Sequence, residues 1–289
     1  LVNNTIIESI PSGLEDGINY NEDTSKATLV LSAPHKDFIY VAGEFNFWSP
    51  TSDYAMKKDS ASERFWLEIE GLEPGEIYTY QYWVSDLSPI DESPSLVKTA
   101  DPFSTMVLSP FDDPWIPETS YPNLPEYPYD YGIEREVTVL KTGQEPYNWQ
   151  VDDFDKPNEE DLIIYEVLVR DFDADRTFQN LIDKIDYFKD LNINAIELMP
   201  VMEYEGNESW GYNTAFHMSV DKFYGPEEKL KEFIDLCHQN GIAVIFDLVM
   251  NHVMGRSPMN RMWMNDPDGN GWGEPRSARA IPAISKRSA

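Results

Sequence analysis

The sequence predicts a multidomain chain in which an all-β sandwich precedes an α/β segment with parallel strands. Two observations carry this prediction. Short β-branched or alternating runs, separated by turn residues, recur through residues 1–108. From residue 159 onward, nearly continuous apolar runs alternate with stretches of helical periodicity. The length of 289 residues suffices for two domains with separate cores.

The first domain, residues 1–108, is expected to be an immunoglobulin-like sandwich. Prolines and glycines between its apolar runs mark turns, and several short strands at this spacing are typical of two packed sheets. The predicted strands are 27–32, 38–41, 65–69 and 77–84.

A connector is expected at residues 109–158. Six prolines between residues 110 and 128 alternate with aromatic residues. Proline removes a backbone donor and breaks helices, while aromatic side chains can hold an extended segment against a folded neighbour. We therefore predict an ordered connector rather than a flexible linker.

Residues 159–275 are expected to contain three strand–helix units. Thr177 is a candidate N-cap of the first helix, which should run to about residue 191, and Pro226 and Gly241 bracket the second. The predicted strands are 162–169, 195–199 and 242–249, the first of them buried on both faces.

Two α/β architectures fit this order, a doubly wound open sheet and a (β/α)8 TIM barrel. The first strand–helix turn, residues 170–175, is acidic and lacks the glycine-rich loop that binds phosphates. This disfavours a nucleotide-binding sheet and favours the first three units of a truncated barrel. In either fold, functional residues gather at the carboxyl ends of the strands.

Composition restricts the class of partner. The formal net charge is −30, from 52 acidic and 22 basic residues. Such a surface disfavours nucleic acid and anionic membranes, whose phosphates require Lys and Arg, but it is compatible with a neutral polysaccharide. Solubility or a saline habitat also explains it. No apolar run approaches the ~18 residues that span a bilayer. Cys237, the single cysteine, is expected to be a buried apolar residue.

Both ends of the chain are unusual. It begins at Leu1 rather than Met, so we expect a trimmed N-terminus and an extracytoplasmic or secreted location, although no signal sequence is visible. Residues 276–289 hold four basic and no acidic residues. We expect a non-native or disordered tail there, with a basic surface loop as the alternative.

Three polar residues cluster where the third predicted strand ends: Asp247, Asn251 and His252. A carboxylate in an apolar run such as that of Asp247 requires a partner. A lone histidine near a strand end is more often structural, but three convergent polar groups favour a functional site.

The segment 247–252 resembles the first conserved region of the α-amylase family, glycoside hydrolase family 13. Other segments resemble the family's first barrel strand, as it occurs in pullulanase-like, branching-enzyme-like and bacterial α-amylase members, its second barrel strand, the loop after that strand, and the start of the next helix. Residues 43–48 resemble a family 48 carbohydrate-binding module. The barrel segments are 164–172, 194–200, 209–213 and 224–225.

The resemblance implies a retaining hydrolase of α-1,4 bonds in starch or glycogen, or a debranching or branching transglycosylase of the same family. The family's nucleophile and acid/base, expected about 5–5.5 Å apart, follow strands four and five. Because only three such strands are predicted in this sequence, the resemblance implies no hydrolytic activity for this chain alone. A non-catalytic glucan-binding protein is the alternative from another class.

Site roles are implied as well. His252 would hydrogen-bond glucosyl hydroxyls, and Tyr212, with Trp210 in the same loop, would lie against the sugar ring. Asp247 would orient partners within the site, and Asn251 would bind calcium; no organic cofactor is implied. For Tyr212, simple loop packing is the alternative.

Three tryptophans of the first domain have two interpretations. Trp48, Trp66 and Trp83 form either a glucan-stacking platform or part of the core and interdomain packing. The sequence does not fix which faces point outward, so both stay open.

Overall fold

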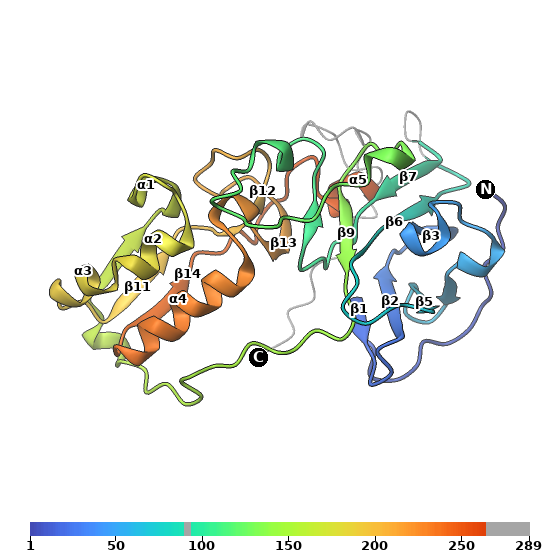
Figure 1. Ribbon diagram of the computed structural model, residues 1–289. Coiled ribbons are helices and arrows are strands. Elements are labelled where there is room, and N and C mark those ends of the chain that lie inside the picture. The colour runs from blue at the N-terminus through green and yellow to red at the C-terminus, as the bar shows by residue number, and fades with distance from the viewer. Residues whose placement is uncertain (90–93, 264–289) are drawn as a thin grey trace. The chain divides into compact units, whose positions relative to one another are not determined.

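The computed structural model describes residues 1–89 and 94–263 and contains two compact units (Figure 1). Unit 1 comprises Leu1–Pro110 and Pro125–Gln144 and resumes at Val253. Unit 2 comprises Phe111–Leu124 and Glu145–His252. Within the described residues, no helix is long and apolar enough to cross a membrane.

This division corrects the domain boundaries expected from the sequence. The connector 109–158 is not a separate segment, because residues 125–144 belong to unit 1 and its remaining parts mostly to unit 2. The α/β segment also ends earlier than residue 275, since the chain returns to unit 1 at Val253. The predicted tail, 276–289, lies outside the described residues.

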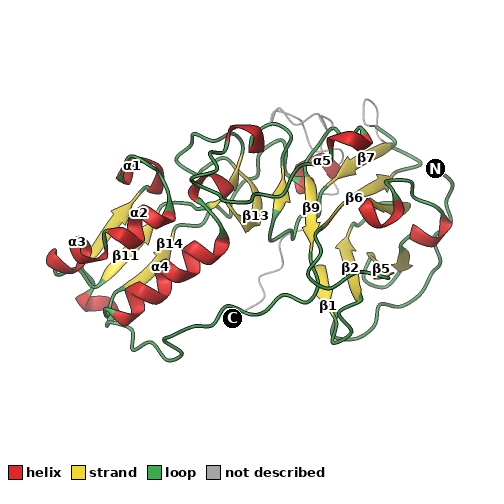
Figure 2. Cartoon of the chain, viewed as in Figure 1, coloured by secondary structure: helices red, strands yellow, loops and turns green. Residues whose placement is uncertain are grey.

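Unit 1 is built from two antiparallel sheets (Figure 2). The first has the order β1-β2-β5-β4, and the second has the order β3-β6-β9-β8, with β7 also paired to β6. The first sheet contains β1 (Gly17–Tyr20), β2 (Lys26–Ser32), β4 (Lys57–Asp59) and β5 (Arg64–Glu70). The second contains β3 (Phe38–Gly43), β6 (Tyr78–Ser85), β7 (Leu96–Thr99), β8 (Val107–Leu108) and β9 (Val137–Leu140).

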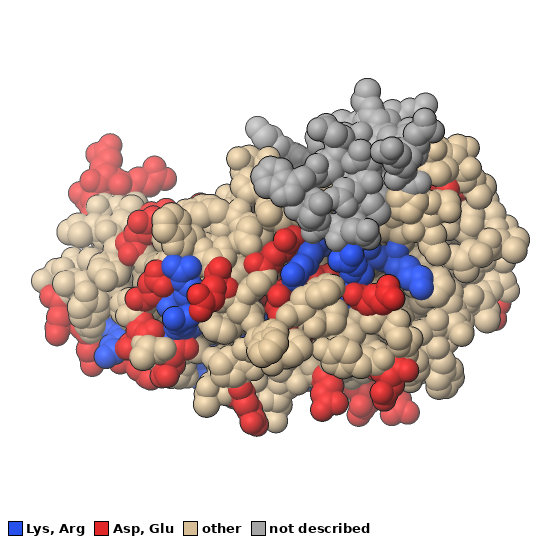
Figure 3. Space-filling model, turned by 90° about the horizontal axis from the view of Figure 1, so that it is seen from above, with Lys and Arg blue, Asp and Glu red and all other residues tan. Residues whose placement is uncertain are grey.

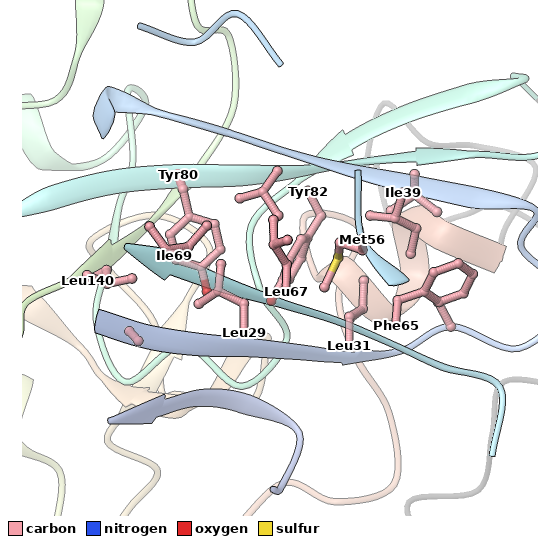
Figure 4. Close-up of a cluster of buried hydrophobic side chains, with 14 of the residues drawn as sticks. Leu29, Leu31, Ile39, Met56, Phe65, Leu67, Ile69, Tyr80, Tyr82 and Leu140 are labelled. Carbon is pink, nitrogen blue, oxygen red and sulfur yellow. The ribbon is translucent and has the colours of Figure 1, made fainter. Parts of the chain in front are cut away.

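One apolar core joins the two sheets (Figure 4). Leu29 and Phe65 come from the first sheet, and Ile39 and Tyr80 come from the second; all four are fully buried. Alternate residues of a strand point to opposite faces, so each sheet contributes one apolar face. The four strands predicted from the sequence are confirmed as β2, β3, β5 and β6, whereas the immunoglobulin-like topology stays a prediction.

Unit 2 contains a three-stranded parallel sheet with the order β10-β11-β14. Its strands are β10 (Ile164–Val167), β11 (Ala195–Leu198) and β14 (Ala243–Phe246). The helices are α1 (Val169–Phe172), α2 (Phe178–Asp183), α3 (Ile185–Asp190) and α4 (Glu227–Gln239). An antiparallel pair, β12 (Met202–Tyr204) and β13 (Thr214–Val220), lies between the second and third parallel strands in sequence.

Helices α2 to α4 cover one face of this sheet (Figure 1). Val167 and Leu198 belong to the core cluster that also contains Phe188 and Phe233. Since side chains alternate along a strand, Glu166, which directly precedes Val167 in β10, points to the opposite face of the sheet. The prediction of a first strand buried on both faces is therefore wrong.

The helical predictions are confirmed with one correction. Thr177 is the N-cap of α2, where its hydroxyl accepts a hydrogen bond from the Asn180 backbone N–H. The first helix is not continuous, because Lys184 leaves the helical region (φ −103°, ψ 15°) and separates α2 from α3. Cys237 is buried in α4, and burial raises the pKa of its thiol to about 12.

The last described element, α5 (Pro258–Trp263), belongs to unit 1. Met262 is fully buried in the core shared by the two sheets, and Trp263 is a member of the same cluster. The segment after the third parallel strand therefore returns to the β-rich unit.

Candidate functional site

The site expected at the strand ends begins with Asp247. This residue follows β14 directly, and its backbone N–H donates to the Leu198 carbonyl oxygen at 2.9 Å. That bond extends the β11–β14 pairing by one residue and fixes the start of the loop. Asp247 thus lies at the carboxyl end of the sheet, where parallel-sheet proteins assemble ligand sites.

A tight loop presents Tyr212. The Gly211 backbone adopts φ +90°, and a Cβ at this position would overlap the carbonyl oxygen of Pro200. Only glycine meets both conditions. The Ser209 hydroxyl hydrogen-bonds Asn213 and accepts from the Gly211 N–H at 2.9 Å, which closes the loop around the tyrosine.

Four predicted site residues meet in what we call the rim cluster: Tyr212, Asp247, Asn251 and His252. The Tyr212 hydroxyl donates to Asp247 Oδ2 at 2.6 Å. His252 Nε2 lies 2.6 Å from the Tyr212 carbonyl oxygen and Nδ1 lies 3.0 Å from Asn251 Oδ1. Because a carbonyl oxygen only accepts, Nε2 carries a proton.

The rim cluster is open to solvent. Tyr212 is 40% exposed, and the neighbouring Trp210 is 61% exposed. The hydrogen bond to Asp247 raises the pKa of Tyr212 to about 12, with smaller contributions from burial and from the charges of Asp247, Glu166 and Glu197. The phenol therefore stays protonated and remains a donor at neutral pH. Trp210 lies in the same loop, but no contact joins it to the cluster among the described interactions.

His217 supports the rim and was missed by sequence reasoning. It lies on β13, and its Nε2 is 2.8 Å from the carbonyl oxygen of Val249. Burial lowers the pKa of this imidazole, so the neutral form is favoured. Nothing in the local sequence distinguishes it from an ordinary strand residue.

The calcium prediction at Asn251 stays a prediction. Among residues 1–89 and 94–263, no group of three or more His, Cys, Asp or Glu side chains is arranged to hold a metal ion. The partner found for the Asn251 amide is His252.

Of the two interpretations of the tryptophans in unit 1, burial favours packing over a glucan-stacking platform. Trp48 and Trp66 are only 6% and 7% exposed, and Lys57 Nζ covers the Trp66 ring at 4.2 Å. Lys98 Nζ lies 4.0 Å from the centroid of the half-buried Trp83 ring. Sugar stacking requires an open ring face, and these rings are already occupied by protein atoms.

A second polar cluster in unit 2 is buried. We call Lys222, Glu203, Asp113 and Asp221 the buried charge cluster. The Lys222 ammonium donates to Glu203 and lies 3.3 Å from Asp113 Oδ1. Asp221 accepts backbone N–H bonds from Tyr204 and Phe223 at 3.2 and 3.0 Å.

Burial controls the ionisation of these groups. It raises the pKa of Glu203 to about 7, although the attraction of Lys222 opposes the shift. Burial and the charge of Glu203 raise the pKa of Asp221. For Lys222, burial lowers the pKa, but Glu203 and Asp113 outweigh it and the net shift is upward. On the face shown in Figure 3, by contrast, acidic side chains lie at the surface among smaller groups of basic ones.

Comparison with known proteins finds a family model that matches part of the α/β segment. Residues 164–265 match the family model "Alpha amylase, catalytic domain". A malto-oligosyltrehalose trehalohydrolase from Saccharolobus solfataricus is 36% identical over 107 residues, 37% of this chain and 19% of that protein. A 1,4-alpha-glucan branching enzyme from Chlamydia muridarum is 29% identical over 245 residues, 83% of this chain and 29% of that protein.

Solved structures agree on the fold. A putative alpha amylase from Salmonella typhimurium has a TM-score of 0.63 at 20% identity, covering 85% of this chain and 35% of its own. A Group B Streptococcus pullulanase in complex with maltotetraose has a TM-score of 0.61 at 21% identity. The match covers 85% of this chain and 34% of the pullulanase chain. The chain spans less than a third of the length of these curated relatives.

Proposed function

We propose that the chain is part of an α-amylase-family enzyme acting on α-glucans, on the basis of the match of residues 164–265 to the α-amylase catalytic-domain model. The rim cluster would hold one glucose unit of a starch- or glycogen-like chain. Hydrolysis of α-1,4 bonds with retention is the proposed reaction, and branching or debranching by the same family is the alternative.

One observation carries the proposal: the 2.6 Å hydrogen bond that joins Tyr212 to Asp247 at the open strand end. A pyranose ring has apolar C–H faces and a polar edge, so it needs an aromatic face beside hydroxyl partners. The exposed Tyr212 ring supplies the first. The Asp247 carboxylate and the His252 imidazole supply the second.

The net charge of −30 also supports a neutral polymer as ligand. An acidic surface repels polyanions but leaves the binding of uncharged sugars unaffected. Calcium at Asn251 is part of this proposal, because an amide oxygen is a ligand type that calcium accepts.

Affinity electrophoresis in amylose or glycogen gels tests the binding site. The chain should be retarded, and Tyr212→Ala or His252→Ala should weaken binding about tenfold, which corresponds to about 1.4 kcal/mol. Tyr187→Ala, which removes an equally exposed tyrosine from α3, is the matched control and should bind normally. Undiminished retardation of both rim variants would refute the site.

We further propose that residues 1–289 bind without cleaving. In the α-amylase family, the two carboxylates of the retaining mechanism follow barrel strands four and five, whereas unit 2 contains three parallel strands. A reducing-sugar assay on the purified polypeptide should therefore show no release above background. Cleavage that tracks the protein through purification would contradict this.

A further inference from the structure

We propose that His217 is a positioning residue for glucan binding, which holds the segment of Asn251 and His252 against β13. The inference rests on the proposed glucan-binding function and deepens it. All the residues that carry it belong to unit 2.

The hairpin of β12 and β13 presents the tyrosine of the rim cluster. Tyr212 lies two positions before Thr214, the first residue of β13. The Thr214 hydroxyl donates to the Gly211 carbonyl oxygen at 3.1 Å, and the Asn213 side-chain amide donates to the Glu205 carbonyl oxygen at 2.8 Å. The hairpin itself therefore positions Tyr212.

The segment that carries the rim histidine is held differently. Residues 249–252 form no helix or strand, and hydrogen bonds link them to the hairpin at both ends. At one end, the Val249 carbonyl oxygen lies 2.8 Å from His217 Nε2. At the other end, His252 Nε2 lies 2.6 Å from the Tyr212 carbonyl oxygen. These two links set the distance between the imidazole and the tyrosine ring.

Sugar binding disturbs the link at His252. Its Nδ1 lies 3.0 Å from Asn251 Oδ1, so both ring nitrogens already have protein partners, and a glucosyl hydroxyl must displace one of them. Asn251 is the adjacent residue and moves with the imidazole, whereas the bond to Tyr212 spans two loops and is exposed. An exposed hydrogen bond exchanges at little cost, so the link to Tyr212 is the one that opens.

His217 preserves the other link. Val249 is buried, and His217 Nε2 carries the proton of this bond because a carbonyl oxygen only accepts. A hydrogen bond to a buried residue is costly to break, so it persists while His252 exchanges its partner. Asn251 and His252 thus stay within a few residues of a fixed point.

The physical consequence is preorganisation. A segment released at both ends samples more backbone states, and a ligand that needs one of them binds more weakly by that fraction. Removing the His217 donor should therefore reduce glucan affinity, although every side chain of the rim cluster remains in place.

Affinity electrophoresis of the full chain in amylose gels tests this inference. His217→Phe keeps a planar ring but lacks the donor, so binding should weaken about fivefold. His217→Gln places an amide N–H near the position of Nε2 and should bind within about twofold of wild type. A His217→Phe variant that binds as wild type would overturn the inference. So would a His217→Gln variant that binds as weakly as His217→Phe.

A double-mutant cycle separates positioning from general damage. If His217 acts through His252, then His217→Phe should weaken binding by less than about twofold in the His252→Ala background. The same fivefold loss in both backgrounds would show that His217 does not act through the imidazole.

Val220→Ala is the matched control. This residue lies in the same strand but packs against the apolar core of unit 2, so its truncation should lower the melting temperature without changing glucan affinity. Equal losses of affinity in Val220→Ala and His217→Phe would refute the positioning role. Failure of the wild-type chain to bind amylose would instead refute the proposed function, and this inference with it.

Discussion

The rim cluster and the buried charge cluster are made from similar residues, yet water reaches only one of them. In the rim, Tyr212 and Asp247 form a hydrogen bond at an open strand end. In the buried cluster, Lys222 and Glu203 are both more than nine-tenths buried. A polar group exposed to water can exchange its partner for a sugar hydroxyl at little cost, whereas a buried group cannot. The difference in exposure supports the proposed binding role of the rim cluster and indicates a structural role for the buried charge cluster.

The largest expected effect is on the buried cluster. Lys222→Met leaves Glu203 and Asp113 without their cation, and removing one partner of a buried pair costs about 3–5 kcal/mol of unfolding free energy. Urea unfolding of unit 2 would measure this. Lys229→Met breaks an exposed pair with Glu232 and should change stability by less than about 1 kcal/mol. Similar losses of unfolding free energy in the two variants would show that burial does not set the importance of the Lys222 contacts.

The second effect is a pH dependence of unit 2. Glu203, with a folded pKa of about 7, binds a proton more tightly than it does in the unfolded chain. The contribution of Glu203 to the free energy of unfolding is therefore fully present at low pH and is lost as the pH rises from about 4.5 to 7. We expect unit 2 to lose on the order of 1–3 kcal/mol over that window.

Glu203→Gln isolates this contribution. The amide oxygen can still accept from Lys222, but it does not titrate. Hydrogen exchange of the α4 amides at several pH values should show a flatter profile in the variant. An unchanged slope would assign the dependence to other groups.

The smallest effect concerns the hydroxyl of Tyr212. Tyr212→Phe keeps the ring but removes the donor to Asp247, so glucan affinity should fall only about threefold, as expected for one hydrogen bond of about 0.5–1 kcal/mol. Thermal stability should be almost unchanged, because the residue is exposed. With a pKa of about 12, the phenol should make no pH-dependent contribution to binding between pH 8 and 10.

Sequence reasoning identified the rim but not the buried cluster, and the reason is physical. Asp247 and His252 occur within six residues of each other, next to a strand that periodicity reveals. Lys222 and Asp113 are 109 positions apart, and each looks like an ordinary surface charge in its local context. Local patterns report which face of an element is apolar, but not which distant side chain covers a polar group.

The same limit explains the errors in unit 1. The strands with long alternating runs were predicted, but β9 lies beyond a proline-rich stretch and was assigned to a connector. The sequence does not show which tryptophan rings are accessible, and in the fold lysines cover the rings of Trp66 and Trp83. Their burial depends on pairing between strands, which periodicity does not specify.

The place of β9 has a consequence for synthesis on the ribosome. This strand lies between β6 and β8 in the sheet, so β8 lacks its paired strand until residues 137–138 have left the exit tunnel. Residues 111–124 emerge before β9, but they must wait for Glu203 and Lys222 to join their own unit. Neither unit can therefore mature before translation of the other is under way, and an early pause would leave a half-finished sheet edge available to chaperones.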